Sequence, residues 1–202
     1  MRGKAICFLA VAIVSLIWGQ NGRAQTAAPA TGASSVPKTG ARAEFLAEVG
    51  YYEDRFTRLA QTVPADKYNW RPADGVRSIG EVYAHIVAAN YGIARALGTQ
   101  PPAGVDFKTI AATAGDKVKI VQELGESFAH FRKAVLALSD ADTDKAQKMF
   151  GRDTTQRGAF IMITGHMGEH LGQSIAYART NGIVPPWTAE AEQQKPVDKP
   201  KP

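Results

Sequence analysis

Apolar residues recur at three- and four-residue steps in four separate stretches of this chain, a spacing typical of helices that bury one face. The stretches cover about residues 43–62, 78–97, 116–138 and 155–180. No stretch shows the alternation of a half-buried strand, and no internal repeat is visible. Four helices joined by two long connections, 99–115 and 139–152, predict an all-α fold: a four-helix bundle with long crossover connections.

Residues that start and stop helices support these boundaries. Ser78 followed three residues later by Glu81 predicts a capping box at the start of the second helix. Asn181-Gly182 predicts the end of the fourth helix.

Residues 1–24 have the pattern of a signal peptide. Two basic residues precede an apolar run at 5–18, and small residues at 22 and 24 predict cleavage before Gln25. An uncleaved membrane anchor is the alternative, but the run is short for a bilayer-spanning helix and no stop-transfer charges follow it. We therefore expect a periplasmic or secreted protein with no membrane contact after cleavage.

Loss of the leader changes what charge and cysteine content imply. The leader holds three bases and no acid, so 24 basic residues fall to 21 against 19 acidic ones, and the net charge falls from +5 to +2. So small a surplus gives weak support for nucleic-acid binding, and we expect no nucleic-acid partner. The one cysteine, Cys7, leaves with the leader, so metal chemistry in the mature chain must use His, Asp, Glu and water.

Low-complexity segments flank the predicted helices. Residues 25–41 are rich in Ala, Thr, Ser, Gly and Pro, which predicts a flexible linker. Residues 189–202 are mostly Glu, Gln, Lys and Pro, which predicts a disordered tail. The remaining 42–188 is long enough for one domain with its own core. Bundles of this size often pair through a helix face, so a homodimer is a candidate assembly, although no face identifies the interface.

Three of the four histidines can meet at one point of such a bundle. His166 and His170 are four residues apart, so their imidazoles leave the same side of the fourth helix, one turn apart. His85 lies at the edge of the apolar stripe of the second helix. Three imidazoles and an open position are typical of a reactive metal site rather than a sealed structural one. We therefore take His85, His166 and His170 as candidate metal ligands.

Each of these histidines also has an ordinary interpretation. A single histidine beside an apolar stripe is more often a hydrogen-bonded boundary residue than a ligand, and a pair at this spacing can arise by chance. His130 has no histidine at helical spacing and is interpreted as structural. Glu169 directly precedes His170 and points about 100° away from it. The zinc-protease arrangement, with a base between two ligands, is therefore absent.

The residues around the three histidines resemble a known family. The matching runs are Tyr68-Asn69-Trp70-Arg71-Pro72, Ser78-Ile79-Gly80-Glu81 with His85, and His166-Met167-Gly168-Glu169-His170-Leu171-Gly172-Gln173. In combination, over about residues 42–185, they resemble the DinB-like superfamily. The resemblance implies a four-helix bundle in which His85, His166 and His170 hold a divalent ion, often zinc or nickel.

The resemblance also implies chemistry on a low-molecular-weight thiol. Thiol-dependent members transfer or isomerise with bacillithiol, mycothiol or glutathione, and a coordinated thiol becomes a nucleophile without a protein base. Such thiols are mostly cytoplasmic, so export makes water the other candidate nucleophile. We expect a metal-dependent transferase or hydrolase that acts on a small-molecule substrate. The alternative is a bundle without turnover, whose ion only joins two helices; a pocket open above the ion would distinguish the two.

Neighbouring residues are candidates for supporting roles, each beside an ordinary one. Glu81 is placed to accept the second imidazole hydrogen of His85, or to serve only in the capping box. Gln173 is placed to orient a ligand or to bridge helices. Arg71 and Arg95 are candidates for holding an anionic group. No acid or base lies at a spacing that identifies a catalytic residue.

Overall fold

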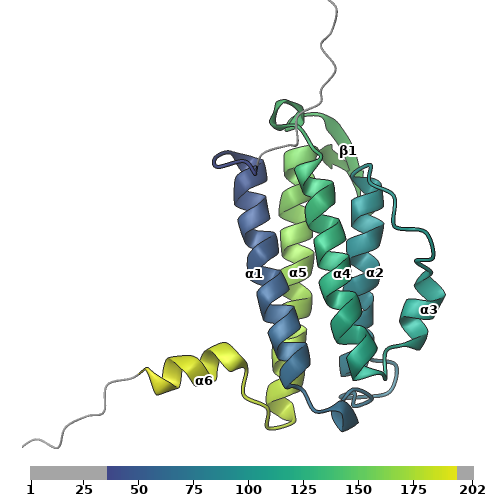
Figure 1. Cartoon of the computed structure of the whole chain (residues 1–202), viewed down its shortest axis with the longest axis vertical. Helices are drawn as coiled ribbons and strands as arrows, with labels where there is room; N and C mark the ends of the chain where they lie inside the picture. The colour runs from purple at the N-terminus through teal and green to yellow at the C-terminus, as the bar shows by residue number, and fades with distance from the viewer. Residues whose placement is uncertain (1–35, 195–202) are drawn as a thin grey trace, which may run out of the picture. The chain divides into compact units, whose positions relative to one another are not determined.

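The computed structural model describes residues 36–194, so the predicted signal peptide and most of the predicted linker lie outside the described residues. Four long helices form a bundle (Figure 1): α1 (Ala41–Thr62), α2 (Ile79–Ala96), α4 (Lys117–Leu136) and α5 (Gln156–Thr180). The predicted all-α fold is confirmed. Within the described residues, no helix combines the length and the apolar character needed to cross a bilayer.

The main helix contacts join α1 to α4 and α5, and α2 to the same two helices. α1 and α5 run in the same direction, since Phe45 stacks on Phe160 near the start of both, with ring centroids 4.3 Å apart. α1 and α4 run in opposite directions, because the Lys117 ammonium at the start of α4 donates to the Val63 carbonyl just after α1, at 2.8 Å. α2 and α4 are parallel (Figure 1), so the connection between them runs the length of the bundle.

Large apolar side chains fill the space between the four helices. Fully buried examples are Val49, Phe56, Leu59, Tyr83, Ile86, Leu124, Phe128, Phe131 and Ile163. The helical periodicity predicts most of this core, but it places Val118 in the stripe of α4, where that side chain is 77% exposed. Ile120 is fully buried instead. The two positions lie about 200° apart around the helix, so only one of them can face the core.

The connections hold more regular structure than the sequence predicts. A helix, α3 (Phe107–Ala112), lies between α2 and α4, and short 3₁₀ turns occur at η1 (Ala65–Lys67) and η2 (Asp140–Asp142). Asp106 starts α3, because its carboxylate accepts the Lys108 N–H at 3.1 Å. The sequence predicts only a coil here, since six residues are too few to show a helical period.

A hairpin between α4 and α5 corrects the prediction that the chain has no strand. β1 (Ala146–Met149) pairs antiparallel with β2 (Arg152–Thr155). Its two turn residues, Phe150 and Gly151, have φ of 49° and 77°. Positive φ at both central positions is the type I′ geometry that matches the twist of paired strands. The strands are short and mostly polar, so they carry no alternating apolar pattern to detect.

The helix ends agree with most of the predicted signals. Ser78 and Glu81 form the capping box: the Ser78 hydroxyl accepts the Glu81 N–H at 3.2 Å, and the Glu81 carboxylate accepts the Ser78 N–H at 2.6 Å. Gly182, with φ of 73°, follows the last turn of α5. A further helix, α6 (Pro186–Gln193), extends into the predicted disordered tail and corrects it as far as Gln193. Pro186 occupies the first position of this helix, where proline is well tolerated.

Candidate metal centre

His85, His166 and His170 meet between α2 and α5. One side-chain nitrogen from each lies within 4.8 Å of the other two, and all three residues are partly buried. The Nε2 atoms of His85 and His166 are 3.2 Å apart. The three residues proposed from spacing are therefore brought together. His130 lies elsewhere, on α4, where its ring centroid is 5.4 Å from that of Tyr91.

The bundle core fixes the positions of the three rings. On α5, Met167 and Leu171 are buried next to His166 and His170, so both histidines border the face that packs inward. On α2, Ile86 directly follows His85 and is buried, so this turn of the helix packs against the core. The histidines thus occupy the rim of a packed interface, where they keep access to a cavity and lose part of their contact with water.

The spacing of the nitrogens suits a single ion. Ligands 2.0–2.1 Å from zinc in a tetrahedral arrangement lie about 3.4 Å from one another. The 3.2 Å between the Nε2 atoms of His85 and His166 is close to this value. Among the described residues, no acidic side chain joins the three-histidine group. The donor set therefore fits a divalent ion that keeps one position open.

Gln173 sets the orientation of His170. The Gln173 Oε1 atom is 3.0 Å from the His170 Nδ1, and the Gln173 amide donates to the Tyr177 hydroxyl at 3.0 Å. An amide oxygen only accepts, so this contact favours the tautomer with the His170 proton on Nδ1, which leaves Nε2 to coordinate a metal ion. Glu81 has no such role toward His85, because its carboxylate is bound by the Ser78 N–H and by Arg71.

Both His85 and His166 are held neutral by their surroundings. Burial lowers the pKa of His85 to about 4, with further contributions from the positive charge of Arg77 and from the other two histidines. Burial likewise lowers the pKa of His166 to about 4, with His170 and Arg77 contributing. Neutral imidazole is the form that binds a metal ion, so the low pKa of His85 and of His166 keeps these two rings in the form that binds one.

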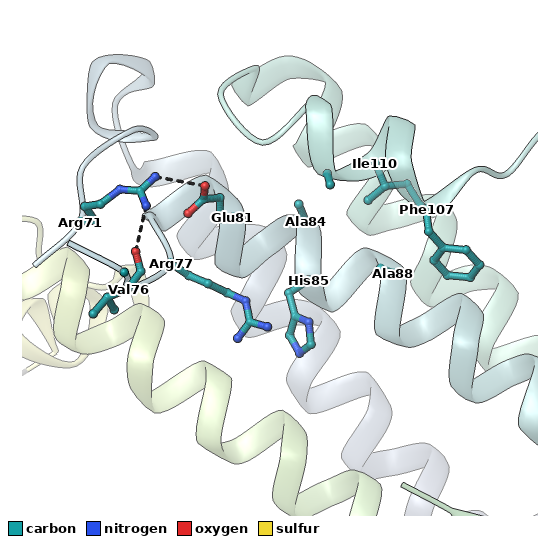
Figure 2. Close-up of a pocket in the computed structure, with 11 residues that line it drawn as sticks. Arg71, Val76, Arg77, Glu81, Ala84, His85, Ala88, Phe107 and Ile110 are labelled. Carbon is teal, nitrogen blue, oxygen red and sulfur yellow. Dashed lines mark hydrogen bonds and ion pairs between the residues drawn. The ribbon is translucent and has the colours of Figure 1, made fainter. Parts of the chain in front are cut away.

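Two cavities reach His85. The first, of about 440 Å³, is lined by Arg71, Val76, Arg77, Glu81, Ala84, Ala88, Phe107 and Ile110. In this cavity the Arg77 guanidinium extends toward the His85 ring (Figure 2). The second, of about 460 Å³, is lined by Ala89, Ile93, Met149, Phe150, His166 and His170. Open space next to the nitrogens is what a reactive site needs and a sealed one lacks.

Comparisons with known proteins identify the family. A family model described as the DinB superfamily matches residues 52–174, which is more than half of the chain. The chain belongs to the DinB superfamily. A crystal structure of a DinB-like protein from Bacillus cereus is similar, at 20% identity, covering 70% of this chain and 93% of that one, with a TM-score of 0.61. A DinB-like protein from Bacillus subtilis matches at 19% identity over 70% and 94%, with a TM-score of 0.46.

A comparison with curated proteins finds no match. The predicted resemblance to the DinB superfamily is confirmed, and at 20% identity the Bacillus cereus structure supports the fold alone. The chemistry of this DinB superfamily member has to be argued from its own residues.

The structure assigns other contacts to several residues that the sequence proposes for supporting roles. Arg71 donates to Glu81 at 3.0 Å and to the Val76 carbonyl at 3.1 Å. The Arg95 guanidinium lies 5.8 Å from the centroid of the Phe107 ring.

Two residues at the site are missed by sequence reasoning. Arg77 is the last residue of the loop before Ser78, and only the packing of that loop brings it to His85. Phe150 is a residue of the hairpin turn, and its ring centroid lies 5.2 Å from that of His166. For Arg77, the sequence offers only the weak signal of a basic residue directly before a helix cap. For Phe150, the Phe-Gly pair gives no usable signal.

Proposed function

We propose that this DinB superfamily protein is a metal-dependent transferase or hydrolase. His85, His166 and His170 would hold one divalent ion, and zinc or nickel suits a set of imidazole ligands. When bound, such an ion lowers the pKa of a water or a thiol at its open position and so supplies a nucleophile for attack on a small electrophile. The observation that carries the proposal is the convergence of three imidazole nitrogens within 4.8 Å, with His85 lining a cavity.

The open geometry favours an enzyme over a structural ion site. A structural site is closed by a fourth protein ligand, and none joins the histidines within residues 36–194. Both cavities have room for a small molecule, because pockets for such ligands usually measure about 300–1,000 Å³. The rival function, an ion that only joins α2 to α5, does not account for these two cavities.

The protein's own residues prepare the site in two ways. Gln173 holds the ring of His170 in one tautomer, and the low pKa of His85 and of His166 keeps both rings unprotonated. The apolar side chains of Ile93, Met149 and Phe150 line the second cavity together with the histidines, so a reactant there would meet apolar surface beside the ion. These features lower the cost of bringing an ion and a reactant together.

Export to the periplasm or the exterior is part of the proposal and rests on the sequence pattern of residues 1–24. N-terminal sequencing of the protein recovered from its native host tests it. A chain that begins at Gln25 supports export with cleavage, whereas a chain that retains the apolar run contradicts it.

Metal analysis of protein purified without a histidine tag tests the site. We expect about one divalent ion per chain in the wild type and no tightly held ion in His166→Ala, since removing one of three ligands leaves too few. His85→Ala and His170→Ala should behave in the same way. His130→Ala is the matched control and should keep its metal. Unchanged metal content in all three ligand variants would refute the site.

A further inference from the structure

The charge of the site with an ion bound would favour an anionic ligand. Three neutral imidazoles leave the two positive charges of a divalent ion uncompensated, and Arg77 adds a third beside His85. The carboxylate that shares the first cavity, Glu81, is bound by Arg71 and by the Ser78 N–H. A bound ion together with Arg77 would therefore form a strongly positive spot that its own side chains do not neutralise.

The two arginines of the first cavity have different partners. Arg71 is held by Glu81 and by the Val76 carbonyl, which fixes the loop that leads into α2 (Figure 2). Arg77 makes no hydrogen bond or ion pair with any other residue in the described part of the chain. Its guanidinium extends into the cavity toward His85, so its five N–H donors are available to a ligand.

The opposite character of the cavity's other wall completes the site. Ala84, Ala88, Ile110 and Phe107 contribute apolar surface from α2 and α3. A ligand seated here would meet the Arg77 guanidinium and the His85 ring close together on one side, and apolar side chains from α2 and α3 on the other. This combination selects for a small molecule with a carbon chain and a negative terminus.

We propose that Arg77 binds a carboxylate of the substrate, and that the substrate of this site is a small carboxylic acid whose reacting group lies at His85. The inference rests on the proposed function, because it places the reacting group at the ion. The planar fork of an arginine pairs with a carboxylate through two parallel hydrogen bonds, which fixes orientation as well as position. Arg77 is thus a residue that determines substrate specificity.

Three probes of similar size separate the two halves of this proposal. The first, 3-mercaptopropionate, carries a thiol and a carboxylate. The second, 2-mercaptoethanol, carries only the thiol, and propionate carries only the carboxylate. In cobalt-loaded protein, the sulfur-to-cobalt absorption band reports the thiol at the ion. In zinc-loaded protein, the nuclear magnetic resonance signal of the Arg77 Nε–H group, assigned by its loss in Arg77→Gln, reports the carboxylate.

We expect propionate and 3-mercaptopropionate to shift the Arg77 signal and 2-mercaptoethanol to leave it in place. Arg77→Gln should weaken binding of 3-mercaptopropionate about tenfold or more, in keeping with the loss of a charge-assisted pair. Its binding of 2-mercaptoethanol and its cobalt content should not change. Arg179→Gln, which removes the same charge from an exposed position on α5, should leave both thiols unaffected.

The outcomes separate the two proposals. An unshifted Arg77 signal, or an equal loss of affinity for both thiols in Arg77→Gln, overturns the carboxylate site whatever the ion does. Absence of bound cobalt contradicts the proposed metal function, and a shift of the Arg77 signal by propionate in the metal-free protein would still support the carboxylate site in that case.

Discussion

The Oε1 atom of Gln173 lies 3.0 Å from the Nδ1 atom of His170, almost one turn back along α5. A contact of this kind decides which nitrogen of a ligating histidine is free and limits rotation of its ring. The amide nitrogen of the same side chain donates to the Tyr177 hydroxyl at 3.0 Å, so Gln173 is held at both ends of its amide.

Replacing Gln173 should therefore weaken metal binding. Partners of this kind typically contribute about 10–100-fold to metal affinity, and we expect a loss in that range for Gln173→Leu. Gln173→Glu keeps an acceptor at the same position and should retain most of the affinity. Competition with a chromophoric chelator measures both. Equal affinity of the wild type and Gln173→Leu would show that the contact does not support the site.

The low pKa values of His85 and His166 predict how the metal-free protein responds to acid. Each pKa is about 4 in the folded chain and 6.5 in the unfolded one. Between these values the unfolded chain binds more protons, so the free energy of unfolding should decrease as the pH falls from 6.5 to 4. Urea unfolding across this range measures the slope. A variant with both His85→Gln and His166→Gln should show a clearly smaller slope, and an identical slope would contradict the assignment.

The hairpin turn offers a test of backbone strain. Phe150 has φ of 49°, a region that asparagine and glycine adopt more easily than phenylalanine. Phe150→Asn creates Asn-Gly, the preferred type I′ pair, and should raise the free energy of unfolding by about 1 kcal/mol. Phe107→Asn is the control, because it removes a ring of similar exposure from a helix with ordinary φ and should destabilise the protein. A loss of stability in both variants would show that the Phe150 ring contributes more than the strain costs.

Two glycines in the bundle should respond to alanine in opposite directions. A Cβ added at Gly80 would lie 1.8 Å from the carbonyl oxygen of Ala114, so the backbone must move, and we expect Gly80→Ala to cost about 1–3 kcal/mol. Gly125, inside α4, has no such neighbour within 4 Å. Gly125→Ala should stabilise the protein by about 1 kcal/mol, because alanine favours the helix. Thermal or urea unfolding of both variants checks the pair, and equal changes would mean that the approach of Ala114 to α2 is not tight.

The parts of the fold that the sequence reveals are those that repeat over many residues. Helical periods persist through about 20 residues in each long helix, so the bundle and the pair His166 and His170 can be predicted from spacing. The meeting of His85 with that pair needs the direction in which α2 and α5 pack, which periodicity does not contain. The resemblance to a family supplied it.

The features that the sequence does not reveal depend on few residues or on distant contacts. The hairpin has two polar four-residue strands, too short for a pattern to emerge. Val118 and Ile120 are both apolar and β-branched, so only the packing of α4 against its neighbours decides which one is buried. No sequence feature distinguishes Arg77 from other loop arginines. Its place beside His85 appears only once the loop before α2 is folded.

His85 and His166 lie 81 positions apart along the chain, and this separation gives a bound ion a mechanical role. An ion held by both would act as a cross-link that encloses α3, α4 and the hairpin in one covalent-and-coordinate ring. Closing so long a ring lowers the entropy of the unfolded chain, and the chain regains this entropy if the ion dissociates. With a single cysteine, the chain cannot form an internal disulfide, so metal coordination would take the place of such a cross-link. Scarcity of metal would then shorten the lifetime of the folded protein and also abolish the proposed activity.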